Sequence, residues 1–336
     1  MRGVVLDGPG LIGIKNVPEP KPAEGWPLIK IKATGICGSD VNSFKGKGQV
    51  VACPIILGHE AAGEVVETAG VSAFKPGDGV IIEPYLFCGE CYPCSLGHRN
   101  CCEHLKCLGV HTDGAMSEYI THPEGLLHKK PEGMPWEHAA FVEPLTIATH
   151  GVHRVKAKAG EYGAVIGAGT IGILTALYLK HLGLHPILID LLDSRLEVAR
   201  DLGVEHTILS DGSAPLEEVK RITGGRGAET VFEISGSVSG AADTILLASY
   251  AGRISLTGWP SSAPRLETTL VTRRELVLYG SRNSAGEFPE AIDLINGGTI
   301  PAGKVISNII GFDDIPDTMR QIAEYPSKTL KSIALV

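Results

Sequence analysis

The second half of the chain opens with Gly167-Ala168-Gly169-Thr170-Ile171-Gly172, a G-x-G-x-x-G motif between a short apolar run and an apolar stretch of helix length. Glycines at this spacing allow a tight turn and a close approach of the backbone to a pyrophosphate, and the following helix presents free N–H groups to the anion. The motif alone is weak evidence in a chain with 42 glycines. Its place between a predicted strand and a predicted helix strengthens it, so we expect a dinucleotide-binding turn here.

Short apolar runs and helix-length segments alternate from the motif onward. The predicted strands are 164–166, 186–189, 231–234, 253–256 and 276–279, and the clearest predicted helices are 171–182 and 194–202. Strands and helices alternating at this spacing are typical of a doubly wound parallel sheet.

Asp190 ends the second predicted strand, 18 residues after Gly172. A carboxylate at this place accepts hydrogen bonds from the ribose 2′-OH and repels a 2′-phosphate. Arg195 is close enough in sequence to hold a 2′-phosphate instead. We weigh the carboxylate more heavily, and the sequence therefore favours NAD over NADP.

The first third of the chain has a different pattern. β-Branched runs at 28–32, 62–66 and 79–82 are separated by Gly and Pro and predict antiparallel strands of a barrel or sandwich. The tail combines a predicted helix at 289–296 with a predicted strand at 332–336. A length of 336 residues is also more than one ordinary core accommodates, so we expect two domains.

Composition excludes several kinds of partner. Thirty Lys and Arg stand against 38 Asp and Glu, a net charge of −8, which is no basic footprint for a nucleic acid. No run reaches the roughly 18 apolar residues of a membrane span, and no signal peptide is visible, so we expect a cytosolic protein. In that compartment eight cysteines suggest metal binding or catalysis before disulfides.

Cys88, Cys91, Cys94 and Cys102 have the spacing C-x2-C-x2-C-x7-C. Thiolates this close in sequence can surround a Zn²⁺ ion with no open position, as in a structural site. The alternatives are a set of free thiols, or a register in which the adjacent Cys101 replaces Cys102. Cys53 and Cys107 resemble small apolar residues.

Cys37, His59, Glu60 and Glu143 are the candidates for a second site. They stand in the segments GICGSD (35–40), GHE (58–60) and VEPL (142–145). Each is unremarkable alone, but together they supply a thiolate, an imidazole and carboxylates, a set suited to a catalytic zinc with one open position.

With these segments, the four-cysteine lobe, DGAMSEY (113–119) and GAGTIG (167–172), the chain resembles the zinc-dependent medium-chain alcohol/polyol dehydrogenases over essentially its whole length. The resemblance implies an α/β fold in which a β-rich GroES-like catalytic domain is interrupted by a Rossmann domain. We expect the catalytic domain at 1–147 and 285–336, with its structural zinc lobe at 86–105, and the NAD-binding domain at 148–284.

The resemblance assigns Cys37 and His59 to the catalytic zinc and leaves open whether Glu60 or Glu143 is the third protein ligand. It makes Asp40 the acceptor that orients His59, and it places Ser39 at the reacting oxygen. Relatives often carry a histidine five residues after the ligand cysteine, where this chain has Asn42. Because an amide cannot titrate, we expect the proton to leave through water, with Glu60 or Glu143 taking part.

The resemblance also names residues of the cofactor and substrate sites. The expected cofactor contacts are Gly167, Gly169, Ile171, Gly172, Asp190, Arg195, Leu256, Gly258 and Ser281, and the expected substrate contacts are Ser39, Arg282 and Asn283. NCCE (100–103), GVHTDG (109–114) and GSRN (280–283) are similar to sugar-acid dehydrogenases, so Arg282 could pair with a substrate carboxylate, although an ordinary ion pair is the alternative.

The expected activity is transfer of a hydride from a secondary alcohol of a polyol or sugar acid to NAD⁺, with two zinc ions per chain and a homodimer or homotetramer as the assembly. The alternatives are a threonine-type amino-alcohol dehydrogenase, a zinc-free quinone reductase of the same fold, and a non-catalytic NAD-binding structural or sensor protein. The presence of every candidate ligand argues against the last two.

Overall fold

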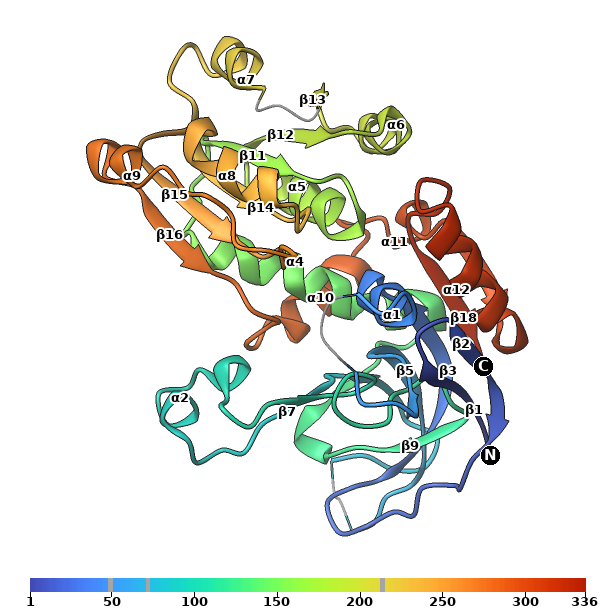
Figure 1. Ribbon diagram of the computed structural model, residues 1–336. Coiled ribbons are helices and arrows are strands. Elements are labelled where there is room, and N and C mark those ends of the chain that lie inside the picture. Colours follow the sequence, from blue (N-terminus) through green and yellow to red (C-terminus); the bar gives the residue numbers. More distant parts are fainter. Residues whose placement is uncertain (48–50, 71–72, 212–214) are drawn as a thin grey trace. The chain divides into compact units, whose positions relative to one another are not determined.

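The computed structural model describes residues 1–47, 51–70, 73–211 and 215–336, and its chain divides into two units. Unit 1 combines Met1–Glu143 with Ala285–Val336, and unit 2 is Pro144–Ser284. The first division therefore falls slightly before the expected 147/148 boundary, near the start of a helix that begins at Val142. Figure 1 shows that unit 1 contains both ends of the chain, because the red C-terminal strand Ser332–Leu335 pairs with the blue strand Leu28–Ile36.

Unit 2 is built on a parallel sheet with the strand order β13-β12-β11-β14-β15-β16. Its strands are β11 Tyr162–Ile166, β12 His185–Asp190, β13 His206–Leu209, β14 Ala228–Glu233, β15 Ala248–Leu256 and β16 Val277–Gly280. This order is that of the doubly wound dinucleotide-binding sheet, whose strand order reverses between β11 and β14. The expected fold class is confirmed.

Helices connect these strands and pack on the sheet. They are α4 Val142–Arg154, α5 Thr170–His181, α6 Asp193–Asp201, α7 Leu216–Ile222, α8 Val238–Leu247 and α9 Thr268–Arg274. Helix α5 lies against β11 and β12, and α8 lies against β14 and β15 (Figure 1). The sheet core is aliphatic, with Ala164, Ile187, Val231 and Ile254 fully buried between these layers.

Unit 1 contains antiparallel sheets, as the short β-branched runs predict. Its strands are β1 Arg2–Gly8, β2 Leu11–Asn16, β3 Leu28–Ile36, β4 Ile55–Ile56, β5 Glu60–Glu67, β6 Gly79–Ile82, β7 Tyr85–Leu86, β8 Lys106–Cys107, β9 Tyr119–Thr121, β10 Leu127–Lys129, β17 Asn308–Gly311 and β18 Ser332–Leu335. The largest sheet runs β10-β6-β5-β3-β18-β17 with β9 beside β3, and a smaller one runs β2-β1-β4.

Short helices complete unit 1. They are α1 Gly38–Phe44, α2 Tyr92–Ser95, α3 Trp136–Ala140, α10 Phe288–Asn296, α11 Ala302–Val305 and α12 Ile315–Glu324, with the 3-10 turns η1 Arg99–Cys101, η2 Glu124–Leu126 and η3 Phe312–Asp314. Among the described residues no helix combines the length and the apolar character that crossing a bilayer requires.

Two register details of unit 1 matter for the site. Strand β18 pairs with β3 in antiparallel fashion, with Ser332 opposite Ile36, so the start of β18 lies beside the end of β3. Strand β5 pairs with the other edge of β3, with Gly35 opposite Glu60. Residues that are far apart in sequence thus meet at one end of β3.

Candidate functional site

Cys37 stands at the turn from strand β3 into helix α1. It is the N-cap of α1, and the carboxylate of Asp40 accepts the backbone N–H of Cys37 at 3.0 Å. This reciprocal arrangement is a capping box, which holds the turn by satisfying N–H groups at the start of the helix. The segment GICGSD therefore presents its thiol from a rigid strand-to-helix turn, while Asp40 is 1% exposed.

His59 and Glu60 come from the start of strand β5, beside the same end of β3. The ligand atoms of Cys37, His59 and Glu60 all lie within 4.8 Å of one another. A Cβ atom on Gly35 would stand 2.0 Å from the Glu60 carboxylate, so only glycine leaves room for this side chain. The close approach of the Glu60 carboxylate thus explains why the segment GICGSD begins with glycine.

The group is buried and strongly charged. His59 is 7% exposed and Glu60 is 1% exposed. Burial lowers the pKa of His59, but the nearby Cys37 thiolate and Asp40 outweigh that effect and raise its pKa well above the ordinary value. The side chains that favour a proton on His59 are also the ones that would attract a divalent cation.

Asp40, expected to accept a hydrogen bond from His59, lies beside that histidine but too far away for a hydrogen bond. Asp40 Oδ1 lies 3.7 Å from His59 Nδ1, which is an ion-pair distance rather than a hydrogen bond. Within the described part of the chain, His59 Nδ1 is buried without a hydrogen-bond partner. The other carboxylate oxygen of Asp40, Oδ2, accepts the backbone N–H of Cys37.

Lys331 is a charged neighbour that the sequence reading missed. Its ammonium group donates to Glu60 and also to the backbone oxygen of Ile36 at 3.2 Å, and its side chain is 3% exposed. Lys331 immediately precedes β18, so the pairing of β18 with β3 brings it to the site. The only sequence signal was a lone lysine before an apolar terminal run.

Glu143 lies outside the group formed by Cys37, His59 and Glu60. It is the second residue of α4, it is 4% exposed, and its carboxylate accepts the phenolic O–H of Tyr85. Burial is the main cause that raises the pKa of Glu143 to about 7, while the nearby His59 acts in the opposite direction. The sequence left open whether Glu60 or Glu143 lies with Cys37 and His59, and in the structure it is Glu60.

Ser39 and Asn42 lie on α1, and both are exposed. Cys107 is buried, like a small apolar residue, whereas Cys53 is exposed. Cys107 pairs with Tyr85 across the β7–β8 ladder.

A half-buried thiol, a buried imidazole and a buried carboxylate lie close enough together to fit a Zn²⁺ ion with one position left for another ligand. The donor set supports this fit, because thiolate, imidazole and carboxylate groups are the ligands that Zn²⁺ takes in proteins.

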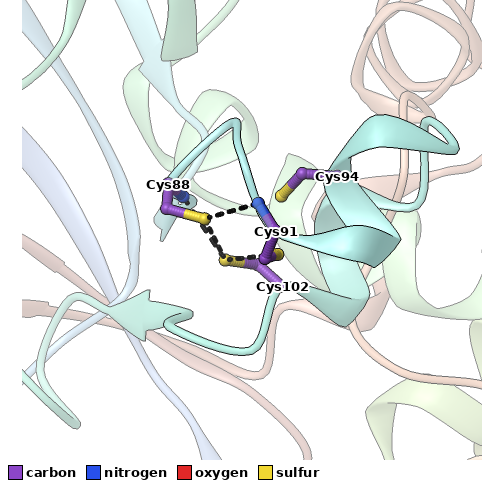
Figure 2. Close-up of side chains that lie close together, drawn as sticks. All are labelled: Cys88, Cys91, Cys94 and Cys102. Carbon is purple, nitrogen blue, oxygen red and sulfur yellow. Dashed lines mark hydrogen bonds between the residues drawn. The ribbon is translucent and has the colours of Figure 1, made fainter.

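A second group of four ligands lies in the lobe between β7 and β8. Cys88, Cys91, Cys94 and Cys102 have their sulfurs within 4.8 Å of one another (Figure 2). Two of the separations are 3.8 Å and 3.5 Å, close to the roughly 3.8 Å edge of a tetrahedron with zinc–sulfur bonds of about 2.3 Å. Cys101 is exposed and stands outside the group, so the geometry selects the register with Cys102.

Backbone donors prepare this lobe for thiolates. The N–H groups of Cys88 and His104 point at the Cys102 sulfur, both at 3.3 Å. Backbone hydrogen bonds from Glu103 and Cys94 lower the pKa of Cys91 to about 7, whereas desolvation raises the pKa of Cys94 to about 12. Such a mixed set of thiols favours a bound cation, which would hold all four as thiolates.

The glycine motif of unit 2 forms the turn between β11 and α5. Gly167 has φ of +103°, a value that other residues rarely adopt, and Gly169 is the N-cap of α5. A Cβ atom on Gly172 would lie 1.7 Å from the backbone oxygen of Gly167. The first and third glycines are therefore required by the backbone itself, and Ile171 is held in the first turn of the helix.

Asp190 ends β12 beside this turn. Its carboxylate accepts the N–H of Ala168 at 2.6 Å and the N–H of Leu192 at 2.9 Å, and Arg195 Nη1 lies 3.8 Å away. Asp190 and Arg195 line a cavity of about 380 Å³ together with Ser210 and Ser237. A cavity with these walls can hold the adenosine half of a dinucleotide.

Glu233 is a further residue of this unit that the sequence reading missed. It ends β14, is 1% exposed, and accepts the Ser235 hydroxyl and the N–H of Gly236 at 2.5 Å and 3.0 Å. A Cβ atom on Gly258 would stand 2.2 Å from its carboxylate, which explains that glycine. Burial raises the pKa of Glu233.

The other expected cofactor and substrate residues follow the last two strands of unit 2. Leu256 ends β15, and its oxygen accepts the N–H of Ser281 at 2.9 Å. Arg282 and Asn283 come directly after Ser281, and Asn283 has φ of +52°. These residues form one segment at the carboxyl ends of parallel strands, where ligands of such sheets bind.

Family models match both units. The alcohol dehydrogenase GroES-like domain matches residues 23–132, and the zinc-binding dehydrogenase domain matches residues 170–297. An uncharacterized zinc-type alcohol dehydrogenase-like protein of Haemophilus influenzae is 44% identical, over 98% of this chain and 97% of its own length.

Two relatives with named activities are similar over most of their length. Sorbitol dehydrogenase of Bacillus subtilis is 30% identical over 98% of this chain and 96% of its own. The 2-dehydro-3-deoxy-L-galactonate 5-dehydrogenase of Pseudoalteromonas atlantica is 35% identical over 88% of this chain and 87% of its own.

Solved structures agree with these matches. A zinc-binding dehydrogenase of Sinorhizobium meliloti bound to NADP is 30% identical, with a TM-score of 0.91, over 100% of this chain and 99% of its own. An Escherichia coli alcohol dehydrogenase with bound NADH is 30% identical, with a TM-score of 0.92, over the same shares. The chain belongs to the zinc-dependent medium-chain alcohol/polyol dehydrogenases and is an NAD(P)-dependent dehydrogenase of that family.

Proposed function

We propose that this enzyme oxidises a secondary alcohol of a polyol or sugar acid, with NAD⁺ as the hydride acceptor and two zinc ions per chain. The observation that carries the proposal is the group of Cys37, His59 and Glu60, whose ligand atoms lie within 4.8 Å of one another. A zinc ion held there would act as a Lewis acid and lower the pKa of a bound alcohol, and NAD⁺ would accept the hydride.

The chain's own residues would prepare that chemistry. Cys37, His59 and Glu60 would hold the catalytic ion, and Lys331 would hold Glu60 in place through the buried ion pair. Ser39, exposed on the first turn of α1 two residues after Cys37, would donate a hydrogen bond to the substrate hydroxyl. Because Asn42 cannot titrate, the proton would reach solvent through Ser39 and water, with the buried carboxylate of Glu143 as an acceptor in the same unit.

The second zinc would be structural. Four thiols surround a single point in the lobe, and no fifth donor is needed to complete a tetrahedron. This ion would cross-link a loop whose regular elements are all short: β7, α2, η1 and β8.

NAD would be preferred because Asp190, in the wall of the cavity, would face the ribose of a bound adenosine. Its carboxylate is already oriented by two backbone N–H groups, so it cannot turn away from a 2′-phosphate without leaving those donors unpaired. Arg195 offers a 2′-phosphate some attraction, but it is drawn toward Asp190 at 3.8 Å. Asp190→Ser should therefore raise kcat/KM for NADP relative to NAD by about ten-fold or more, because removing the carboxylate removes the repulsion.

The substrate class follows from the relatives' names and from Arg282. Sorbitol is a polyol and 2-dehydro-3-deoxy-L-galactonate is a sugar acid, and Arg282 is a cation suited to a bidentate pair with a carboxylate. Arg282→Met should lower kcat/KM for aldonates about ten-fold or more and leave neutral polyols little changed. Equal losses on both substrates would contradict the acid-recognition role.

One screen tests the whole proposal. Purified enzyme with its metal content measured by elemental analysis would be assayed for NADH formation from polyols, aldonates and L-threonine, and for the reverse reaction with ketoses. We expect two zinc ions per chain, turnover of a polyol or an aldonate, and loss of both turnover and one zinc in Cys37→Ser. Turnover of L-threonine alone would favour the amino-alcohol alternative, and undiminished turnover in Cys37→Ser would contradict the proposed site.

A further inference from the structure

Tyr85 has no role in the chemistry above, yet it forms a buried polar contact with Glu143. Tyr85 lies on β7, opposite Cys107 of β8, and is 5% exposed. Its hydroxyl donates to the carboxylate of Glu143, which is 4% exposed. A buried phenol and a buried carboxylate are thus each satisfied by the other.

The pair stands beside the proposed metal site. Ile82 at the end of β6 lies opposite Ala61 of β5, next to Glu60, and β7 starts at Tyr85 shortly after Ile82. Glu143 also interacts electrostatically with His59 and Glu60. Glu143 therefore lies near the ligand group, although its carboxylate is not among the ligand atoms of Cys37, His59 and Glu60 that lie within 4.8 Å of one another. The structure therefore holds two carboxylates near the proposed ion, of which Glu60 lies with the other ligands and Glu143 is bound to Tyr85.

The number of ligands makes this choice important. Cys37, His59 and Glu60 supply three donors and leave a fourth tetrahedral position for substrate. A second carboxylate would fill that position and convert an open site into a closed one. The Glu143 oxygen bound to Tyr85 would have to give up that hydrogen bond to approach the ion, and the buried phenol would lose the acceptor that it has in the folded protein.

We propose that Tyr85 is a positioning residue that holds the Glu143 carboxylate out of the zinc coordination sphere and so keeps the fourth position open. The inference rests on the proposed zinc site at Cys37, His59 and Glu60. It assigns Tyr85 a role through Glu143 rather than any contact with the reacting atoms. The short ladder of β7 with β8 fixes the backbone of Tyr85, and the first turn of α4 fixes that of Glu143.

The test uses the full-length protein with Co²⁺ in place of zinc, because the visible bands of Co²⁺ report coordination number. The difference between the spectra of the wild type and Cys37→Ser isolates the catalytic site from the four-cysteine lobe. Tyr85→Phe removes only the hydroxyl. Tyr178→Phe is the matched control, since Tyr178 is 1% exposed and its hydroxyl contacts His153 at 2.9 Å in the other unit.

We expect Tyr85→Phe to change the difference spectrum toward a site with an added carboxylate and to tighten zinc binding, measured by chelator competition, by about ten-fold, the size of a typical effect from a residue behind the ligands. Tyr178→Phe should change neither quantity. Glu143→Gln should leave the wild-type spectrum unchanged, and the double variant Tyr85→Phe/Glu143→Gln should restore it.

Two results would overturn the inference. One is a Tyr85→Phe protein whose spectrum and zinc affinity equal those of the wild type. The other is a Glu143→Gln protein that loses the wild-type bands, since Glu143 would then be a ligand already. Failure of the proposed zinc site looks different, because the wild type and Cys37→Ser would then show no difference spectrum at all.

Discussion

Replacing Lys331 by methionine tests the buried ion pair with Glu60. Both side chains are almost fully buried, at 3% and 2% exposure. Removing one partner of a buried pair leaves the other charge without compensation and costs about 3–5 kcal/mol. For a unit of this size, about 2–4 °C per kcal/mol corresponds to a fall in Tm of roughly 6–20 °C.

The assay is differential scanning calorimetry of chelator-treated protein, so that zinc bound to Glu60 does not obscure the effect. Lys331→Arg keeps the charge and should lose much less. Lys331→Met/Glu60→Gln removes both charges and should recover most of the loss, because a neutral amide is cheaper to bury than an unpaired carboxylate.

The effect should not depend on pH near neutrality. Burial lowers the pKa of Lys331, but Glu60 and other anions outweigh it and raise the pKa above 10.5. The stabilisation is therefore fully present below about pH 10.5 and is lost as pH rises through the higher folded-state pKa. A Lys331→Met protein within about 1 kcal/mol of the wild type at pH 7, or a double variant as unstable as the single one, would refute this reasoning.

Three further predictions concern other sites. Gly172→Ala places a Cβ atom 1.7 Å from the Gly167 oxygen, so fluorescence titration should show NADH binding weakened by about ten-fold or more, and an unchanged Kd would count against the turn as the pyrophosphate site. Cys102→Ser should reduce the zinc content by one ion per chain in elemental analysis, whereas Cys101→Ser should not, and equal zinc loss in both would contradict the ligand register. The pKa of Glu143 is raised from 4.5 to about 7, so the metal-free protein should lose up to about 3 kcal/mol of stability as pH rises from about 4.5 to 7, because the folded state holds the proton that the unfolded state has released. Glu143→Gln should flatten this slope in denaturation curves measured at several pH values, and a slope that persists would place its origin elsewhere.

Local patterns predicted much of this molecule. The alternation of strands and helices predicted the parallel sheet, because hydrophobic periodicity and strand length are local properties of the chain. The spacing of Cys88, Cys91, Cys94 and Cys102 predicted their gathering, since a short loop holds them near one another whatever the rest of the fold does. Short edge elements such as β13 and α9 were missed, because four to seven residues carry too little periodicity to stand out.

The sequence by itself determined which side chains could serve a metal and a dinucleotide: Cys37 and His59 in their glycine-flanked turns, and Asp190 at the end of a strand. Only the tertiary structure showed that Glu60, rather than Glu143, lies within 4.8 Å of the ligand atoms of Cys37 and His59, and only it revealed Lys331. Glu60 and Lys331 are 271 residues apart in the sequence, and they meet because β3 pairs with β5 on one side and with β18 on the other. Long-range strand register leaves no mark in local sequence, so the assignment of each buried carboxylate to a cation or to a phenol becomes visible only when the sheet has formed.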